Sequence, residues 1–200
     1  MVKKFVSLLS ADASNYEKVM AELEENGCDG FHFDIMDGHF VKNFAFSPKV
    51  IKSLRRHTAL PFQAHLEIEN PGEYIDMFID AGCDVVTIHP QTCKAERELR
   101  YLRAKNILGS VAIDPDVNIV EIFDYLNLID NIIIMSVYPG FGKQRFIAAA
   151  LEKIKRLKEK ISDEKLNITI SIDGGVSKET ESEIIKSGCD ILIYGSSLFE

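Results

Sequence analysis

The chain has 200 residues, of which 46% are apolar, which is enough for one globular domain with a substantial core and excludes a disordered or fibrous protein. Its 23 Lys and Arg residues against 31 Asp and Glu residues give a formal net charge of −8. This sign excludes a protein held to nucleic acid by neutralising phosphates, so an anionic ligand has to be held by local groups. The apolar runs fall far short of the roughly 18 residues that a membrane span needs, so no membrane partner is expected.

The N-terminal segment and the cysteines both predict a cytoplasmic protein. The first apolar run is short and is interrupted by Ser7, whereas an export signal needs roughly 7–15 apolar residues. The cysteines, Cys28, Cys83, Cys93 and Cys189, show no C-x-x-C spacing. A disulfide framework is not expected in a chain of this size, so we expect reduced thiols.

Strand-like and helix-like stretches alternate along the chain. Runs of apolar and β-branched residues predict strands near residues 4–9, 30–36, 62–67, 84–89, 109–113, 131–137, 168–172 and 190–195. Amphipathic stretches predict helices near residues 14–26, 47–57, 71–81, 94–105, 118–127, 145–161 and 177–187. A Gly-Cys-Asp triplet follows three of these helices, at Gly27, Gly82 and Gly188, and marks the junction to the next strand.

This alternation predicts an α/β fold with a parallel sheet. Eight strands in one domain, residues 1–200, favour a closed (β/α)₈ TIM barrel over an open sheet. The chain stops at Glu200, just after the eighth strand, so we expect the final helix to be missing from this chain.

Two of the predicted strands carry polar residues on the face that a barrel usually fills with apolar side chains. Within residues 31–37 the period of two places His32 and Asp34 on one face and three apolar residues on the other. Within residues 63–67 the same separation turns His65 to the polar face. The apolar faces must pack against the helices, so these polar groups are predicted to point into the barrel.

Four of the inward-facing groups predict a metal site. Asp173 ends the seventh strand on its polar face and joins His32, Asp34 and His65. A single buried histidine is more often structural, but four separate strand positions burying polarity together require a cation, because an unpaired buried carboxylate costs several kcal/mol. Two His and two Asp suit one divalent ion, with Zn²⁺ favoured and Fe²⁺, Co²⁺ or Mn²⁺ as alternatives. His89, at a strand end, is expected to be structural or to orient a ligand.

Three glycine-containing segments follow the last three predicted strands, at residues 139–144, 173–177 and 195–197. Glycines allow backbone N–H groups to approach an anion closely, and the loops after the late strands of such barrels commonly bind phosphate. Each segment alone could be an ordinary turn, but their clustering favours a phosphate pocket.

Several motifs, in order, resemble the ribulose-phosphate 3-epimerase family from about residue 5 to the end. They are Ser-Leu-Leu-Ser-Ala-Asp (7–12), His-Phe-Asp-Ile-Met-Asp-Gly-His-Phe-Val-Lys-Asn (32–43), Ala-His-Leu (64–66), Asn-Pro (70–71), Met-Ser-Val-Tyr-Pro-Gly-Phe-Gly-Lys-Gln (135–144), Ile-Asp-Gly-Gly-Val (172–176) and Gly-Ser-Ser-Leu-Phe (195–199). The resemblance implies a (β/α)₈ barrel, a ketose-phosphate substrate and a divalent metal held by His32, Asp34, His65 and Asp173.

The resemblance also implies a reaction and roles for individual residues. D-ribulose 5-phosphate and D-xylulose 5-phosphate would be interconverted through a cis-enediolate, with Asp34 and Asp173 as acid and base on opposite faces. Residues implied to bind substrate are Ser7, Met36, His65 and Met135, and those implied to line the phosphate site are Gly140, Phe141, Gly142, Gly174, Gly175, Gly195 and Ser196. Lys143 is not part of the resemblance, but its charge would assist phosphate binding. We also expect a homo-oligomer.

Four positions depart from the family pattern. Glu67 stands where the family usually has Met, Lys143 where it has Gly, Lys42 where it has Pro, and Asp114 where it has Asn. The departures keep two alternatives open: an epimerase of a hexulose phosphate such as D-allulose 6-phosphate, and a catalytically silent phosphate-binding barrel, for which Glu67 is the best support. A lyase on the same scaffold is disfavoured, because no predicted strand points a lysine inward.

Overall fold

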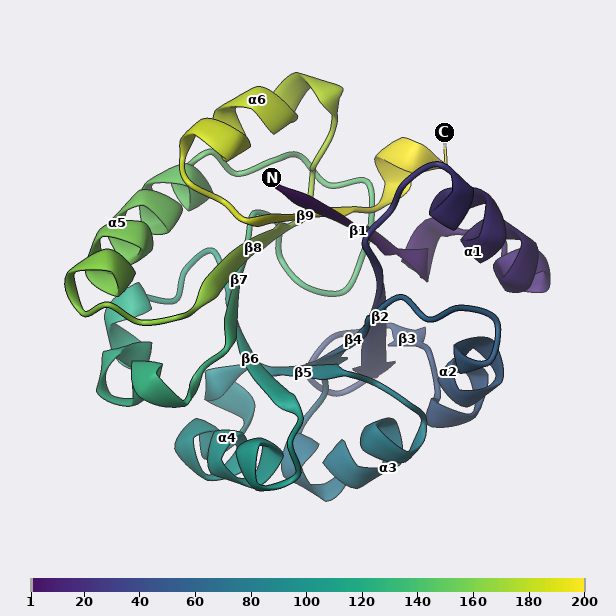
Figure 1. Cartoon of the computed structure of the whole chain (residues 1–200), viewed down its shortest axis with the longest axis horizontal. Coiled ribbons are helices and arrows are strands. Elements are labelled where there is room, and N and C mark those ends of the chain that lie inside the picture. The colour runs from purple at the N-terminus through teal and green to yellow at the C-terminus, as the bar shows by residue number, and fades with distance from the viewer. Residues whose placement is uncertain (1, 200) are drawn as a thin grey trace.

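A computed structural model describes residues 2–199 and contains a closed barrel of eight parallel strands (Figure 1). The barrel strands are β1 (Lys3–Ser7), β2 (Gly30–Asp37), β4 (Phe62–Glu67), β5 (Val85–Ile88), β6 (Leu108–Ile113), β7 (Asn131–Met135), β8 (Thr169–Asp173) and β9 (Ile191–Tyr194). Strand β1 pairs in parallel with both β2 and β9, which closes the ring. A short strand, β3 (Phe44–Ala45), pairs antiparallel with the end of β2 and was not predicted.

Helices surround the barrel and cover its outer surface (Figure 1). They are α1 (Tyr16–Glu25), α2 (Pro48–Arg55), α3 (Ile75–Asp80), α4 (Ala95–Ala104), α5 (Ala149–Asp163) and α6 (Lys178–Lys186). The TIM-barrel prediction is therefore confirmed, with strand ends within about three residues of those expected. Beyond β9 the described chain adds the 3₁₀ turn η6 (Ser196–Leu198).

One predicted helix, near residues 118–127, is instead the 3₁₀ segment η5 (Ile119–Leu128). Its start is capped by Asn118, whose side chain accepts from the Val120 N–H, and Tyr125 interrupts it with a non-helical backbone. Apolar residues spaced by three fit both an α-helix and a 3₁₀-helix, so the pattern alone could not distinguish them. The predicted third helix likewise divides into a 3₁₀ turn, η3 (Pro71–Glu73), and α3.

The main hydrophobic core lies between the strands and the helices, with side chains such as Phe31, Phe33, Phe62 and Leu99 fully buried. Within the barrel lies a small apolar cluster: Phe5, Ala112, Ile133, Met135 and Ile193. Most of the apolar burial that stabilises the fold is therefore outside the barrel.

Polar side chains fill another part of the barrel interior and satisfy one another. The Gln63 Nε2 atom donates to Thr87 Oγ1 at 3.3 Å and to Asn131 Oδ1 at 3.2 Å. Ser110 Oγ donates to Asn131 Oδ1 at 2.9 Å, and Asn131 Nδ2 donates to Ser171 Oγ at 2.7 Å. Buried polar groups are tolerated when they are paired in this way.

Strand register brings distant parts of the sequence together. Ser7 of β1 lies beside His32 of β2, and Asp34 of β2 lies beside His65 of β4. The next few residues toward the carboxyl ends of these strands open onto the barrel mouth, where barrels of this type carry their functional groups. None of the helices in residues 2–199 is long and apolar enough to cross a membrane.

Candidate functional site

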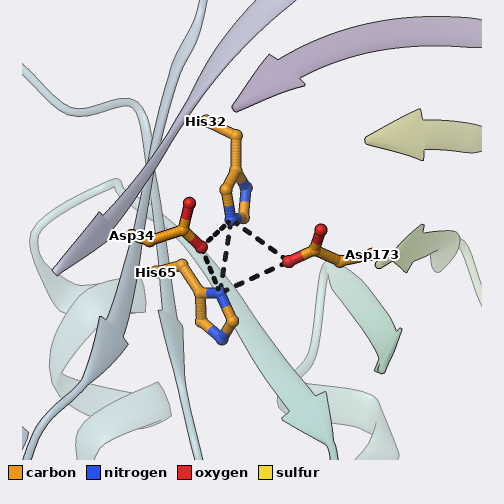
Figure 2. Close-up of side chains that lie close together, drawn as sticks. All are labelled: His32, Asp34, His65 and Asp173. Carbon is orange, nitrogen blue, oxygen red and sulfur yellow. Dashed lines mark hydrogen bonds and ion pairs between the residues drawn. The ribbon is translucent and has the colours of Figure 1, made fainter. Parts of the chain in front are cut away.

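Four buried side chains converge at the barrel centre: His32, Asp34, His65 and Asp173 (Figure 2). The His32 Nε2 atom lies 3.2 Å from Asp34 Oδ1 and 3.2 Å from His65 Nδ1. Asp173 Oδ2 lies 3.7 Å from His32 Nε2 and 3.8 Å from His65 Nδ1. Figure 2 shows the two carboxylates approaching the imidazoles from opposite sides.

This donor set fits a divalent metal ion. A tetrahedral ion with bonds of about 2.0–2.2 Å separates its ligand atoms by about 3.3–3.6 Å. The separations in the His/Asp group run from 3.2 to 3.8 Å, close to that range. Two imidazole nitrogens and two carboxylate oxygens are ligands that Zn²⁺ and neighbouring transition metals accept.

Three surrounding residues hold these four side chains in place. His32 Nδ1 lies 3.0 Å from Gln63 Oε1, and Ser7 Oγ donates to Asp34 Oδ2 at 2.6 Å. The two contacts leave His32 Nε2 and Asp34 Oδ1 turned toward the centre of the group. On the far side of the His65 ring, Nε2 lies 2.8 Å from His89 Nε2. Partners of this kind fix the orientation of metal-binding side chains.

Burial and the charges of neighbouring side chains shift the pKa values of these four residues. Burial alone would lower the pKa of His32, but the charges of Asp34 and Asp173 raise it to about 9. Burial opposes ionisation of Asp34, yet His32 and His65 hold its pKa below the usual range. Burial and the charge of Asp34 raise the pKa of Asp173, and burial lowers the pKa of His65. The two carboxyl groups are thus driven in opposite directions, an arrangement typical of an acid and base pair.

A pocket of about 380 Å³ opens above the group at the barrel mouth. Its size is in the range of small-ligand sites. The sequence-predicted residues that line it are Ser7, Asp34, Met36, Met135, Gly140, Phe141, Gly142, Lys143, Asp173, Gly174, Gly175, Gly195 and Ser196. His32 and His65 are fully buried and lie beneath the lining. The structure therefore brings all the predicted site residues to one place, while their roles stay predictions.

The glycine loops of the pocket have backbones that favour glycine. Gly140, Gly174 and Gly175 have φ values of +114°, +100° and +59°. A β-carbon at Gly174 would collide with the Val137 side chain. Lys143 also lies in the left-handed region, at φ +61°, a conformation that a side chain disfavours and that glycine adopts freely.

Some pocket residues were not among the named candidates, although Gln144 and Ser177 lie in the glycine-containing segments that were predicted to bind phosphate. Gln144 donates from Nε2 to the backbone oxygens of Tyr138 and Phe141, which braces the loop after β7. Ser177 caps α6, and both Ser177 and Thr180 line the pocket, so the positive end of a helix faces it. The Ser-x-x-Thr spacing of a capping box was the available sequence signal.

Glu67, which departs from the family pattern, also belongs to the pocket wall. It is only 2% exposed, and its Oε2 atom has no hydrogen-bond partner. Burial, reinforced by the charges of Asp34 and Asp173, raises its pKa well above the ordinary value. Its inward orientation follows from the same alternation that predicted His65, two residues earlier in β4.

Comparison with known proteins gives a consistent result across nearly the whole chain. Residues 4–199 match the model of the ribulose-phosphate 3 epimerase family. A ribulose-phosphate 3-epimerase from Bacillus subtilis (strain 168) is 37% identical, over 100% of this chain and 93% of that protein. Another from Treponema pallidum (strain Nichols) is 34% identical, over 96% of this chain and 89% of that protein.

Solved structures with the same fold are more distant in sequence. A mutant tryptophan synthase alpha-subunit from Pyrococcus furiosus has a TM-score of 0.73 at 16% identity, covering 99% of this chain and 90% of its own. A 3-hexulose-6-phosphate synthase has a TM-score of 0.69 at 17% identity, covering 100% of this chain and 92% of its own. At such identities the likeness supports the barrel fold alone.

Proposed function

This chain belongs to the ribulose-phosphate 3-epimerase family and is an epimerase, and from that premise we propose that it interconverts D-ribulose 5-phosphate and D-xylulose 5-phosphate with a divalent metal. The observation that carries the proposal is the His32, Asp34, His65 and Asp173 group beneath a glycine-lined pocket. Zn²⁺ is the metal that the donor set suits best.

A divalent metal held by His32, Asp34, His65 and Asp173 would supply a Lewis acid next to the substrate. Asp34 and Asp173 are proposed as the proton-transfer groups. Asp34, with a pKa below its usual range, is a carboxylate ready to accept the C3 proton, while Asp173, with a raised pKa, can hold a proton and return one to the opposite face. Their approach from opposite sides supports an inversion at C3 (Figure 2).

The loops that follow the last strands, β7, β8 and β9, are proposed to hold the phosphate. The pocket wall there is made of Gly174, Gly175, Gly195 and Ser196, together with the amino-terminal end of α6. Backbone N–H groups and a helix amino terminus bind an anion without a cluster of basic side chains. A protein with a net charge of −8 can hold a sugar phosphate in this way, with Lys143 at the rim adding positive charge.

The test is exchange of the C3 hydrogen with deuterated water, followed by NMR on protein of known metal content. The wild type with metal is expected to exchange C3 of D-ribulose 5-phosphate, and Asp173→Asn is expected to lose about 10²–10⁴-fold in exchange rate. Elemental analysis of both proteins separates loss of metal from loss of proton transfer. Absence of exchange in the metal-loaded wild type would overturn the proposal, and exchange only with D-allulose 6-phosphate would reassign the substrate to a hexulose phosphate.

A further inference from the structure

Glu67 places a carboxyl group in the wall of the pocket with one oxygen unpaired. Within residues 2–199, three buried side-chain atoms lack a hydrogen-bond partner: Glu67 Oε2, His89 Nδ1 and Asp114 Oδ1. The last two lie 3.2 Å from each other as an ion pair, so Glu67 Oε2 is the one of the three that stays unpaired. Buried polar atoms are paired in the great majority of cases, so this oxygen requires an explanation.

The Glu67 side chain lies at the boundary between the His/Asp group and the open pocket. Its Oε1 atom is 3.8 Å from His65 Nδ1, and the Gly140 backbone N–H, in the loop after β7, hydrogen-bonds to the carboxyl group. Glu67 is only 2% exposed, yet it lines the pocket of about 380 Å³. A ligand that fills the pocket therefore contacts this carboxyl group, and a polar atom of the ligand can pair with Oε2.

The barrel places Glu67 opposite the residues that are proposed to hold the phosphate. In the ring of eight barrel strands, β4 lies four strands away from β8 in either direction. Strands β8 and β9 lead into the pocket residues Gly174, Gly175, Gly195 and Ser196. A ketose 5-phosphate carries its phosphate at one end of the carbon chain and its C1 hydroxymethyl group at the other. With the phosphate beside β8 and β9 and the carbon chain lying across the His/Asp group, the C1 hydroxyl is the substrate group directed toward β4.

We propose that Glu67 recognises the C1 hydroxyl of the substrate through a hydrogen bond to its unpaired carboxyl oxygen, and so selects ketose phosphates over their 1-deoxy counterparts. This inference rests on the function proposed above and specifies which substrates the site prefers. A hydroxyl both donates and accepts hydrogen bonds, so it pairs with the carboxyl group in either protonation state. A compound without the C1 hydroxyl leaves the buried carboxyl oxygen unpaired, and a site of this kind discriminates strongly against it.

The test compares D-xylulose 5-phosphate with 1-deoxy-D-xylulose 5-phosphate, which differ only in the C1 hydroxyl. Exchange of the C3 hydrogen with deuterated water, followed by NMR on the metal-loaded full-length protein, gives kcat/KM for each compound. Changes in metal content, phosphate binding or proton transfer affect both values, so the ratio of the two isolates the C1 hydroxyl. The wild type is expected to favour the hydroxylated compound by at least about 100-fold, and Glu67→Met is expected to reduce this preference to under about 10-fold.

Two further variants and a binding measurement make the result decisive. Glu67→Gln keeps hydrogen-bonding atoms at the same place and is expected to retain more of the preference than Glu67→Met. Glu69→Met makes the same chemical change on an exposed side chain two residues along the chain, and it is expected to keep the wild-type preference. Dissociation constants of the two compounds, measured by calorimetry, give the same comparison without turnover. Thermal melts identify any variant that fails to fold, and Glu67→Leu takes the place of Glu67→Met if that variant does.

Two results would overturn the role of Glu67. One is equal kcat/KM for the two compounds in the wild type, and the other is a wild-type preference that persists in folded Glu67→Met. Neither result touches the proposed epimerase reaction, which fails if C3 exchange of D-ribulose 5-phosphate is absent.

Discussion

Gln63 Oε1 accepts a hydrogen bond from His32 Nδ1 on the neighbouring strand, at 3.0 Å, and so determines which imidazole nitrogen is left for a metal. The Gln63 amide is itself oriented, because its Nε2 donates to Thr87 and Asn131. The polar interior of the barrel therefore orients His32, which is proposed to bind the metal, as well as filling space.

Replacing this acceptor is expected to weaken the proposed metal site. Gln63→Leu leaves His32 Nδ1 without a partner and frees the ring to rotate, so we expect a loss of zinc affinity of about 10–100-fold. Competition with a fluorescent zinc chelator measures it. Gln63→Glu keeps an acceptor at the same place and is expected to retain more of the affinity. An unchanged affinity in Gln63→Leu would show that the contact does not orient His32.

Gly174→Ala is expected to destabilise the protein by about 2–4 kcal/mol. The residue has φ +100°, which disfavours any side chain, and the new methyl group collides with Val137. Urea unfolding of the two proteins measures the difference. A Val137→Ala background removes the collision but keeps the backbone strain, so Gly174→Ala should cost less stability in that background than in the wild type. An equal loss of stability in the two backgrounds would show that the whole loss comes from backbone strain.

The buried thiols are expected to make the fold sensitive to alkaline pH. Burial raises the pKa of Cys83 and of Cys189 to about 12, against about 8.5 in an unfolded chain. Between these values the folded state keeps protons that the unfolded state has lost, so stability is complete below about pH 8.5 and falls as the pH rises toward 12. Urea unfolding at pH 8 and pH 10 should show a loss that Cys83→Ala reduces by roughly 1–2 kcal/mol. A pH dependence identical in Cys83→Ala and wild type would contradict this assignment.

Lys153→Met is expected to destabilise the segment that follows β6. The Lys153 ammonium donates to the backbone oxygens of Asp114, Pro115 and Val117, at 2.7, 2.9 and 2.7 Å. Without the ammonium group these three carbonyl oxygens lose their donor. We expect the free energy of unfolding, measured with urea, to fall by about 1–3 kcal/mol. Lys155→Met, on the exposed side of the same helix, breaks only an ion pair with Glu152 and should cost less than about 0.5 kcal/mol. Equal losses in both variants would count against the role of these hydrogen bonds.

The barrel was predictable from the sequence because its signals are local. Runs of apolar and β-branched residues identified the strands, and alternation with a period of two predicted that His32, Asp34 and His65 point inward. Strand β3 was missed because two residues carry no periodicity. The 3₁₀ geometry of η5 was missed because its apolar spacing fits an α-helix equally well.

The grouping of Glu67, His89 and Asp114 was not predictable in the same way. Each residue stands at the end of a different strand, and their proximity depends on the register of three neighbours and on how far each side chain reaches. The sequence marked Glu67 as unusual but offered no measure of its distance to His89. The burial of Glu67 and the unpaired state of its Oε2 atom become visible only in three dimensions.

The distribution of apolar contacts has a consequence for how such a protein can change. The packing that keeps the chain folded lies mostly between strands and helices. Side chains inside the barrel therefore contribute less to the stability of the fold. During evolution, side chains inside the barrel can therefore be replaced one at a time and change the chemistry of the site while the fold stays stable. Each new polar side chain must then be hydrogen-bonded or bound to an ion.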